Sequence, residues 1–165
     1  MKNFYLITLF MCLSNLQAWA TGSSEKAVYD LIERVTPGYA SQYRLEIIPS
    51  ENGNDVYEVD GDGQKIILRG NNAVSLATAF NWYLKYTCHA HVSWFGNQLE
   101  LPEKLPQPAH KERRIINGKY RVYMNYCTVS YTAAWWNWER WQQELDYMAM
   151  NAINMPLFSV GLDGV

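Results

Sequence analysis

The sequence has little of what several common classes of protein require. Basic residues are not in excess, since 14 lysines and arginines face 16 aspartates and glutamates and the formal net charge is -2. Without surplus positive charge to neutralise phosphates, we expect no nucleic-acid partner. Beyond the first twenty residues no apolar run is long enough to cross a membrane, so no membrane span is expected. The high apolar content, 48%, argues against long disorder.

Cysteine is also scarce, with three in 165 residues. Cys88 and Cys127 are too few for a disulfide scaffold, and a single bridge between them stays open. The motif Cys88-His89-Ala90-His91 resembles a metal cluster, but no second group of ligands follows at zinc-like spacing. We therefore predict a plain strand there, with no metal and no cofactor.

A second motif, Asp60-Gly61-Asp62-Gly63, has the look of a calcium loop. Its twelfth position is Asn71, where such a loop needs a bidentate glutamate. The interpretation that remains is a hairpin turn.

The first twenty residues have the pattern of a secretory signal peptide. A basic start at Lys2 is followed by the apolar run Phe4–Leu13. Ala18 and Ala20 then supply small residues at the two positions that a signal peptidase recognises before its cleavage site. We predict cleavage after Ala20 and a secreted or periplasmic protein.

Residues 21–101 are predicted to form a small α/β domain. Apolar residues recur at helical spacing in two stretches, from Ala27 to Val35 and from Ala73 to Leu84. Alternating, β-rich segments cover five further stretches: Tyr43–Pro49, Asp55–Asp60, Lys65–Arg69, Cys88–Phe95 and Gln98–Leu101. This order favours a small layer with a helix packed on a mostly antiparallel sheet.

A proline-containing, charged stretch over residues 102–114 is predicted to be a semi-rigid linker. Residues 115–165 then give strand Tyr120–Cys127, helix Trp135–Met150 and strand Ile153–Phe158. That order predicts a βαβ crossover with parallel strands. Two strands cannot be covered on both faces by one helix, so we expect the first βαβ of a truncated (β/α)8 barrel. The overall fold class is α/β.

Aromatic residues are abundant, with 7 tryptophans, 12 tyrosines and 5 phenylalanines. The densest cluster, Trp135-Trp136-Asn137-Trp138 with Trp141, suits either a stacking platform for a sugar or a helix packed against its strand. Because barrel helices lie outside the strands, we favour packing.

The expected barrel end carries two candidate substrate-binding residues, Asn125 and Cys127. They stand two apart at the end of the first strand, so they share a face, and an Asn amide can donate to one sugar hydroxyl and accept from another. Filling of the barrel's upper layer is the alternative. Glycoside hydrolysis normally needs two carboxylates, and only Asp163 follows a strand, so no catalytic residue is predicted.

Three motifs in the second half resemble glycoside hydrolase family 89, the α-N-acetylglucosaminidases. They are a tyrosine-rich strand that ends Asn125-Tyr126-Cys127-Thr128, the helix start Trp135-Trp136-Asn137-Trp138, and the helix end Asp146-Tyr147-Met148-Ala149-Met150-Asn151-Ala152-Ile153-Asn154. Upstream, Ile67–Gly70, Trp82–Tyr86 and Val92–Trp94 are similar to that family's N-terminal domain.

The resemblance implies a retaining exo-glycosidase that acts on glycans with terminal α-linked N-acetylglucosamine, with its catalytic glutamates later in the barrel. It also places Asn125 and Cys127 in the sugar pocket. The loop Val160–Asp163 departs from the family pattern, so Asp163 receives no role. We expect the 165-residue chain alone to be inactive. The alternatives are another exo-glycosidase, such as a β-hexosaminidase or α-glucuronidase, and a non-catalytic carbohydrate-binding module.

Overall fold

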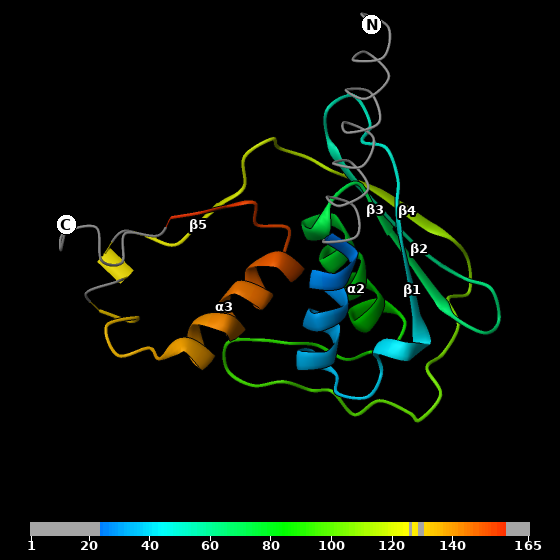
Figure 1. The fold of residues 1–165 in the computed structure, drawn as a ribbon, viewed down its shortest axis with the longest axis horizontal. Coiled ribbons are helices and arrows are strands. Elements are labelled where there is room, and N and C mark those ends of the chain that lie inside the picture. Colours follow the sequence, from blue (N-terminus) through cyan, green and yellow to red (C-terminus); the bar gives the residue numbers. More distant parts are fainter. Residues whose placement is uncertain (1–23, 126, 129–130, 158–165) are drawn as a thin grey trace, which may run out of the picture.

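The computed structural model describes residues 24–125, 127–128 and 131–157, and the predicted signal peptide and Asp163 lie outside them. A four-stranded sheet carries two helices on one face, and a third helix packs against those two (Figure 1). The first helix spans residues 24–35. The remaining elements are a 3-10 turn (Ala40–Gln42), β1 (Tyr43–Ile47), β2 (Asp55–Gly61), β3 (Ile66–Gly70), α2 (Ala73–Tyr86), β4 (Glu112–Ile116), β5 (Val122–Tyr123), α3 (Trp138–Met150) and β6 (Met155–Pro156).

The sheet has the order β1-β3-β2-β4. β1 pairs with β3 in parallel, whereas β2 pairs antiparallel with both β3 and β4. The expected turn between β2 and β3 is confirmed, because the Asp62 side chain accepts the backbone N–H groups of Gln64 and Lys65 at 2.9 and 2.7 Å. This Asx-type turn sends the chain back between β1 and β2, so the mostly antiparallel sheet is confirmed as well.

The core lies between the sheet and α2. Asn72 caps α2 by accepting the N–H of Ser75 at 2.9 Å. Tyr43 of β1 packs edge-on against Phe80 and Tyr83, with ring centroids 5.5 and 5.7 Å away. The end of β3 approaches α2 closely, since a Cβ on Gly70 would lie 2.7 Å from the backbone nitrogen of Leu76. A larger residue at position 70 would therefore push the helix off the sheet.

The two strands predicted over Cys88–Phe95 and Gln98–Leu101 do not form. A single bridge joins His91 to Gln98, and His89 has a left-handed φ of 54°. The chain instead curls around the end of α2, where the N–H of Ala90 donates to the carbonyl of Leu84 at 2.9 Å. The unpaired carbonyls at a helix end thus compete with strand formation.

The stretch expected to be a linker is bound to the sheet for much of its length. Leu105 is buried in the core, and Tyr83 donates to the carbonyl of Pro106 at 2.8 Å. The prediction of extended linker is wrong at its end, because Glu112–Ile116 is β4, paired with β2. The charges on β4 that suggested a linker find partners on β2 instead: Arg113 donates to Glu58 at 2.6 Å.

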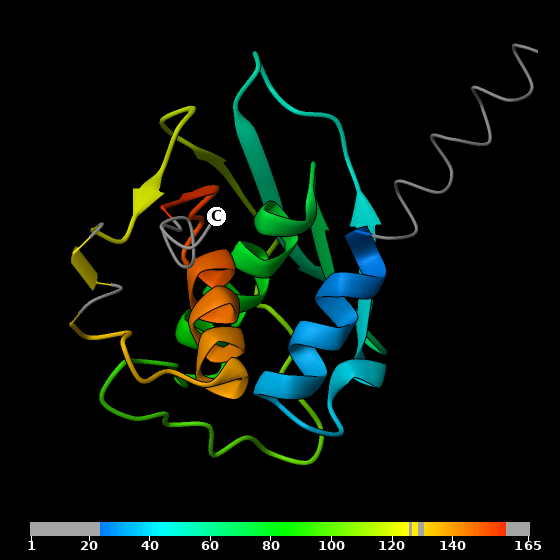
Figure 2. The ribbon, with the colours of Figure 1, turned by 60° about the vertical axis from the view of Figure 1, so that its left-hand side comes forward.

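The predicted strand–helix–strand order and the parallel pairing are confirmed in the second half. β5 and β6 run parallel, with Val122 opposite Met155 and Tyr123 opposite Pro156. Both strands are shorter than expected. The helix α3 lies against α2 and the first helix, as two views of the ribbon agree (Figures 1 and 2). None of the helices among the described residues is long and apolar enough to span a membrane.

Candidate functional site

The site predicted from the sequence lies at the carboxyl end of the parallel pair β5–β6. The pair is held together by backbone hydrogen bonds, among them the N–H of Leu157 to the carbonyl of Tyr123 at 3.0 Å. In a barrel this end carries the substrate-binding loops. The structure places Asn125 and Cys127 directly after β5, at that end.

The local geometry of Asn125 and Cys127 differs from the prediction that they share one face of a strand. β5 ends at Tyr123, and Met124 has a left-handed φ of 75°. The side-chain oxygen of Asn125 accepts the backbone N–H of Cys127 at 2.9 Å, which closes a turn. The two exposed residues are therefore neighbours through a turn, and no residue in the described part of the chain accepts a hydrogen bond from the side-chain N–H groups of Asn125.

Arg121 fixes the start of β5 to the first sheet. Its guanidinium pairs with Asp55 at the start of β2 and donates to the carbonyls of Ala152 and Gly118. Burial alone would raise the pKa of Asp55, but hydrogen bonds from Asn71 and Arg121 lower it below its ordinary value. Asp55 is therefore charged at neutral pH and anchors β5 electrostatically. Sequence reasoning missed this pair, because its members are 66 residues apart.

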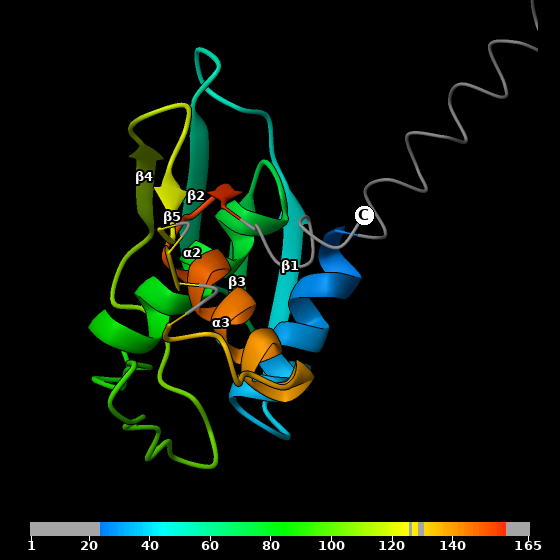
Figure 3. The same cartoon turned by 90° about the vertical axis from the view of Figure 1, so that its left-hand side faces the viewer.

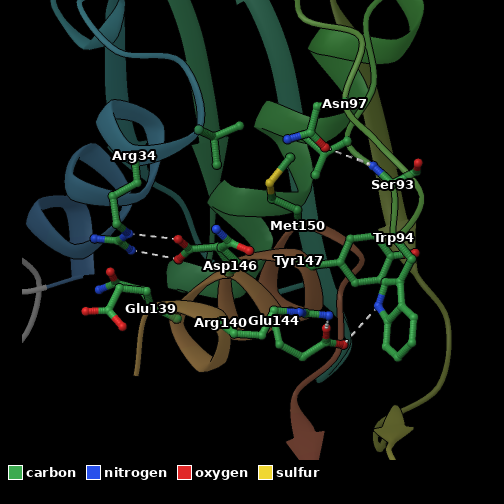
Figure 4. Close-up of a pocket in the computed structure, with 14 residues that line it drawn as sticks. Arg34, Ser93, Trp94, Asn97, Glu139, Arg140, Glu144, Asp146, Tyr147 and Met150 are labelled. Carbon is green, nitrogen blue, oxygen red and sulfur yellow. Dashed lines mark hydrogen bonds and ion pairs between the residues drawn. The ribbon is translucent and has the colours of Figure 1, made fainter. Parts of the chain in front are cut away.

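A pocket of about 410 Å³ lies between α3, the first helix and residues 92–97 (Figure 4). Glu144, 0% exposed, accepts hydrogen bonds from Trp94 Nε1 at 3.2 Å and Arg140 at 2.8 Å. Asp146 receives two hydrogen bonds from Arg34, at 2.6 and 2.7 Å, which raise the pKa of Arg34. Both carboxylates are engaged in ion pairs, so the pocket acts as a polar joint between helices rather than as an acid–base site.

Some rings of the tryptophan cluster are packed against other side chains, whereas others are exposed to solvent. Trp136 packs on Trp141 at 4.9 Å between centroids, and the guanidinium of Arg140 stacks on the Trp136 ring at 4.0 Å. These rings are packed, but on each other and on Arg140 rather than on a strand. Trp135, in contrast, is 93% exposed, and Trp138 is also exposed, so these two rings face solvent just before α3 and at its first residue.

Neither cysteine forms a disulfide: Cys88 is half-buried and Cys127 exposed, and both are free thiols. Burial raises the pKa of the Cys88 thiol. Within residues 24–125, 127–128 and 131–157, no three His, Cys, Asp or Glu side chains gather as metal ligands would.

Comparison with known proteins gives a consistent picture. Residues 26–107 match the family model for the alpha-N-acetylglucosaminidase N-terminal domain, and residues 121–165 match the model for its tim-barrel domain. Human alpha-N-acetylglucosaminidase is 35% identical over 144 residues, which are 84% of this chain and 19% of the human protein.

Solved structures agree with the family models. A family 89 glycoside hydrolase from Clostridium perfringens, in complex with 2-acetamido-1,2-dideoxynojirmycin, superposes with a TM-score of 0.86 at 32% identity, over 95% of this chain and 18% of that one. A double Glu→Gln variant from the same organism, in complex with its substrate GlcNAc-alpha-1,4-galactose, gives a TM-score of 0.83 at 32% identity, over 92% and 18% of the two chains. The chain thus spans about a fifth of the length of these relatives.

Proposed function

Because the chain belongs to the alpha-N-acetylglucosaminidase family, glycoside hydrolase family 89, we propose that it is the N-terminal portion of a retaining exo-glycosidase that removes terminal α-linked N-acetylglucosamine from glycans. The observation that carries the proposal is the parallel β5–β6 pair with the Asn125 turn at its carboxyl end. That pair lies in the segment matched by the barrel model, and the solved relative binds a sugar of this class.

In this proposal Asn125 and Cys127 contact the terminal sugar. The turn that Asn125 closes with the Cys127 N–H fixes its side chain, so that its Nδ2 group points outward as a hydrogen-bond donor. The small Cys127 side chain lets a sugar ring approach the turn closely. Two further carboxylates, about 5 Å apart, would attack the anomeric carbon and protonate the leaving oxygen, as retention requires.

We also propose that this 165-residue chain does not hydrolyse glycosides by itself. The carboxylates of Glu144 and Asp146 are engaged in ion pairs with Arg140 and Arg34, and no pair of unengaged carboxylates stands at the β5–β6 end among the described residues. The predicted signal peptide, with cleavage after Ala20, would export the protein to the periplasm or the medium.

The test compares the two anomers of an aryl N-acetylglucosaminide. A longer reading frame that contains this chain should cleave the α-linked substrate and leave the β-linked one, whereas the 165-residue chain should cleave neither. Cleavage of the β anomer alone would favour a β-hexosaminidase and overturn the proposal. In the longer protein, Asn125→Ala should lower kcat/KM about tenfold, the cost of roughly one lost hydrogen bond of 1.4 kcal/mol. Gln64→Ala, at the exposed β2–β3 hairpin, is the matched control.

A further inference from the structure

A second pocket opens where α2 passes the outer strand of the sheet. It measures about 290 Å³ and is lined by Tyr57, Trp82, Tyr86 and Arg114. Tyr57 of β2 and Arg114 of β4 are paired in register, so they lie side by side on the helix-facing side of the sheet. Trp82 and Tyr86 stand one turn apart on α2. None of the four belongs to β5, α3 or β6, and Figure 3 shows β4 and β2 beside α2 at this edge.

The floor of this pocket is formed by Tyr57, whose hydroxyl is available to bind a ligand. Tyr57 is 8% exposed, and its hydroxyl makes no hydrogen bond to any residue that the structure describes. Burial, the largest cause, raises the pKa of this phenol to about 12, so at neutral pH it is uncharged and able both to donate and to accept. A tyrosine hydroxyl that lines a pocket and has no partner among the described residues can bond to the oxygen atoms of a ligand.

The walls supply aromatic faces and a cation. Tyr86 is 65% exposed, and its ring lies 5.0 Å from that of Trp82 at an interplanar angle of 36°. Arg114 donates through Nε to Glu112, and its two terminal nitrogens have no acceptor within the described residues. The site thus combines stacking surface with hydrogen-bond donors on Tyr57 and Arg114, which line the same small pocket.

We propose that the pocket of Tyr57, Trp82, Tyr86 and Arg114 binds a single pyranose ring of a glycan. The ring's C–H face would stack on the aromatic walls, and its hydroxyl or acetamido oxygens would bond to the Tyr57 hydroxyl and the Arg114 guanidinium. The choice of sugar rests on the proposed function, whereas the pocket is independent of the β5–β6 end. The site would hold a branch of the glycan beside the barrel.

Size and charge favour a neutral sugar over other occupants. Ligand pockets for drug-sized molecules begin at about 300 Å³, so this one suits one ring rather than an oligosaccharide. A nucleobase prefers parallel aromatic faces, which the 36° inclination does not provide. The carboxylate of Glu112 beside Arg114 opposes anionic groups, and the chain has a net charge of -2.

The test is an NMR titration of the 165-residue chain with methyl α-N-acetylglucosaminide, observed through the Trp82 indole resonance and the backbone amides of α2 and β4. Binding in the millimolar range is expected for one ring. Tyr57→Phe, which removes only the hydroxyl, and Tyr86→Ala, which removes one wall, should each weaken binding at least about fivefold, about 1 kcal/mol. Tyr120→Ala is the matched control, because Tyr120 is 63% exposed and lies outside the pocket.

Three outcomes would overturn the proposal. The first is the absence of chemical-shift changes in α2 and β4 when the sugar concentration reaches 50-fold above a dissociation constant of about 1 mM, which is typical of weak ligands. The second is binding that Tyr57→Phe and Tyr86→Ala leave unchanged. The third is shifts confined to Asn125 and Cys127, which would support the proposed function and remove this second site. Failure of the proposed function would appear separately, as the wrong anomer in the hydrolysis assay.

Discussion

The first half of the chain and its second half are stabilised in different ways. In the helix–sheet layer of residues 24–116, large side chains such as Phe80, Tyr83 and Leu68 are fully buried between α2 and the sheet. In the βαβ segment of residues 120–157, the strands are two residues long, and Val122 and Met155 are 60% and 46% exposed. The layer therefore supplies most of the core, and the βαβ segment adds to it chiefly through Met150 of α3.

The contacts between the two halves are both apolar and polar, since Met150 of α3 is buried in the same core as Phe80 and Tyr83. Arg34 holds Asp146 of α3, and Arg121 joins β5 to Asp55. From the other side, Asn81 of α2 donates to the carbonyl of Met150 at 2.8 Å. Paired charges and directed hydrogen bonds fix orientation more than they add stability, because desolvation offsets much of their attraction. The layer is thus a platform that sets the direction in which β5, and with it Asn125, points.

The largest expected effect is a core truncation in the layer. Phe80→Ala should lower the free energy of unfolding by about 3–5 kcal/mol, since the ring is fully buried and its removal leaves a cavity. Trp138→Ala on α3 removes a larger ring that is 64% exposed, and should change stability by less than about 1 kcal/mol. Chemical denaturation of both variants measures the difference, and equal losses would show that the exposed Trp138 ring contributes as much to stability as the buried Phe80 ring.

The layer's elements were predictable where the signal is local. The hairpin at Asp60–Gly63 follows from turn residues between alternating strands, and the cap at Asn72 from its place before an apolar helical pattern. β4 has no such signal: its charges look like a linker until Glu58, 55 residues away, is known to be the partner of Arg113. Pairing across that separation depends on the sheet, which local composition does not encode.

Local sequence signals also predicted the candidate site only in part. The sequence placed Asn125 at the end of the first barrel strand, and the structure confirms that position. The shared strand face was wrong, because Met124 takes a left-handed φ that residue propensities disfavour. The packing of Glu144 beneath Trp94 also had no local sign, since a glutamate on a helix normally faces solvent.

An intermediate effect is expected where the two halves meet at Asp55. Its folded pKa is lowered, so the stabilisation from its ionised form is complete above the unfolded value of about 3.9 and is lost as the pH falls through the lower folded value. Asp55→Asn should therefore cost about 1–2 kcal/mol at pH 7, a charged hydrogen bond, and progressively less at lower pH. Urea unfolding at several pH values measures the loss.

The control for that experiment is Glu100→Gln, an exposed carboxylate with no ion-pair partner in the described part of the chain. Glu100→Gln should leave the pH dependence of the unfolding free energy unchanged. Hydrogen exchange at β5 should rise in Asp55→Asn and stay constant in Glu100→Gln. A wild-type profile that runs parallel to that of Asp55→Asn down to acid pH would mean that the ion pair with Arg121 does not anchor β5.

The smallest effect is a difference in thiol reactivity, with one cysteine in each half. Cys127 is exposed, whereas Cys88 is half-buried and burial raises its thiol pKa, so less of it is thiolate at neutral pH. In the chain from residue 21 onward, alkylation followed by peptide mass analysis should modify Cys127 at least about tenfold faster than Cys88. Phe80→Ala should accelerate the alkylation of Cys88 and leave that of Cys127 unchanged. The Cys88 thiol then reacts more often because the destabilised layer opens more often. Equal acceleration at both thiols would mean that the halves open together, and the platform would then be no more independent than the segment it supports.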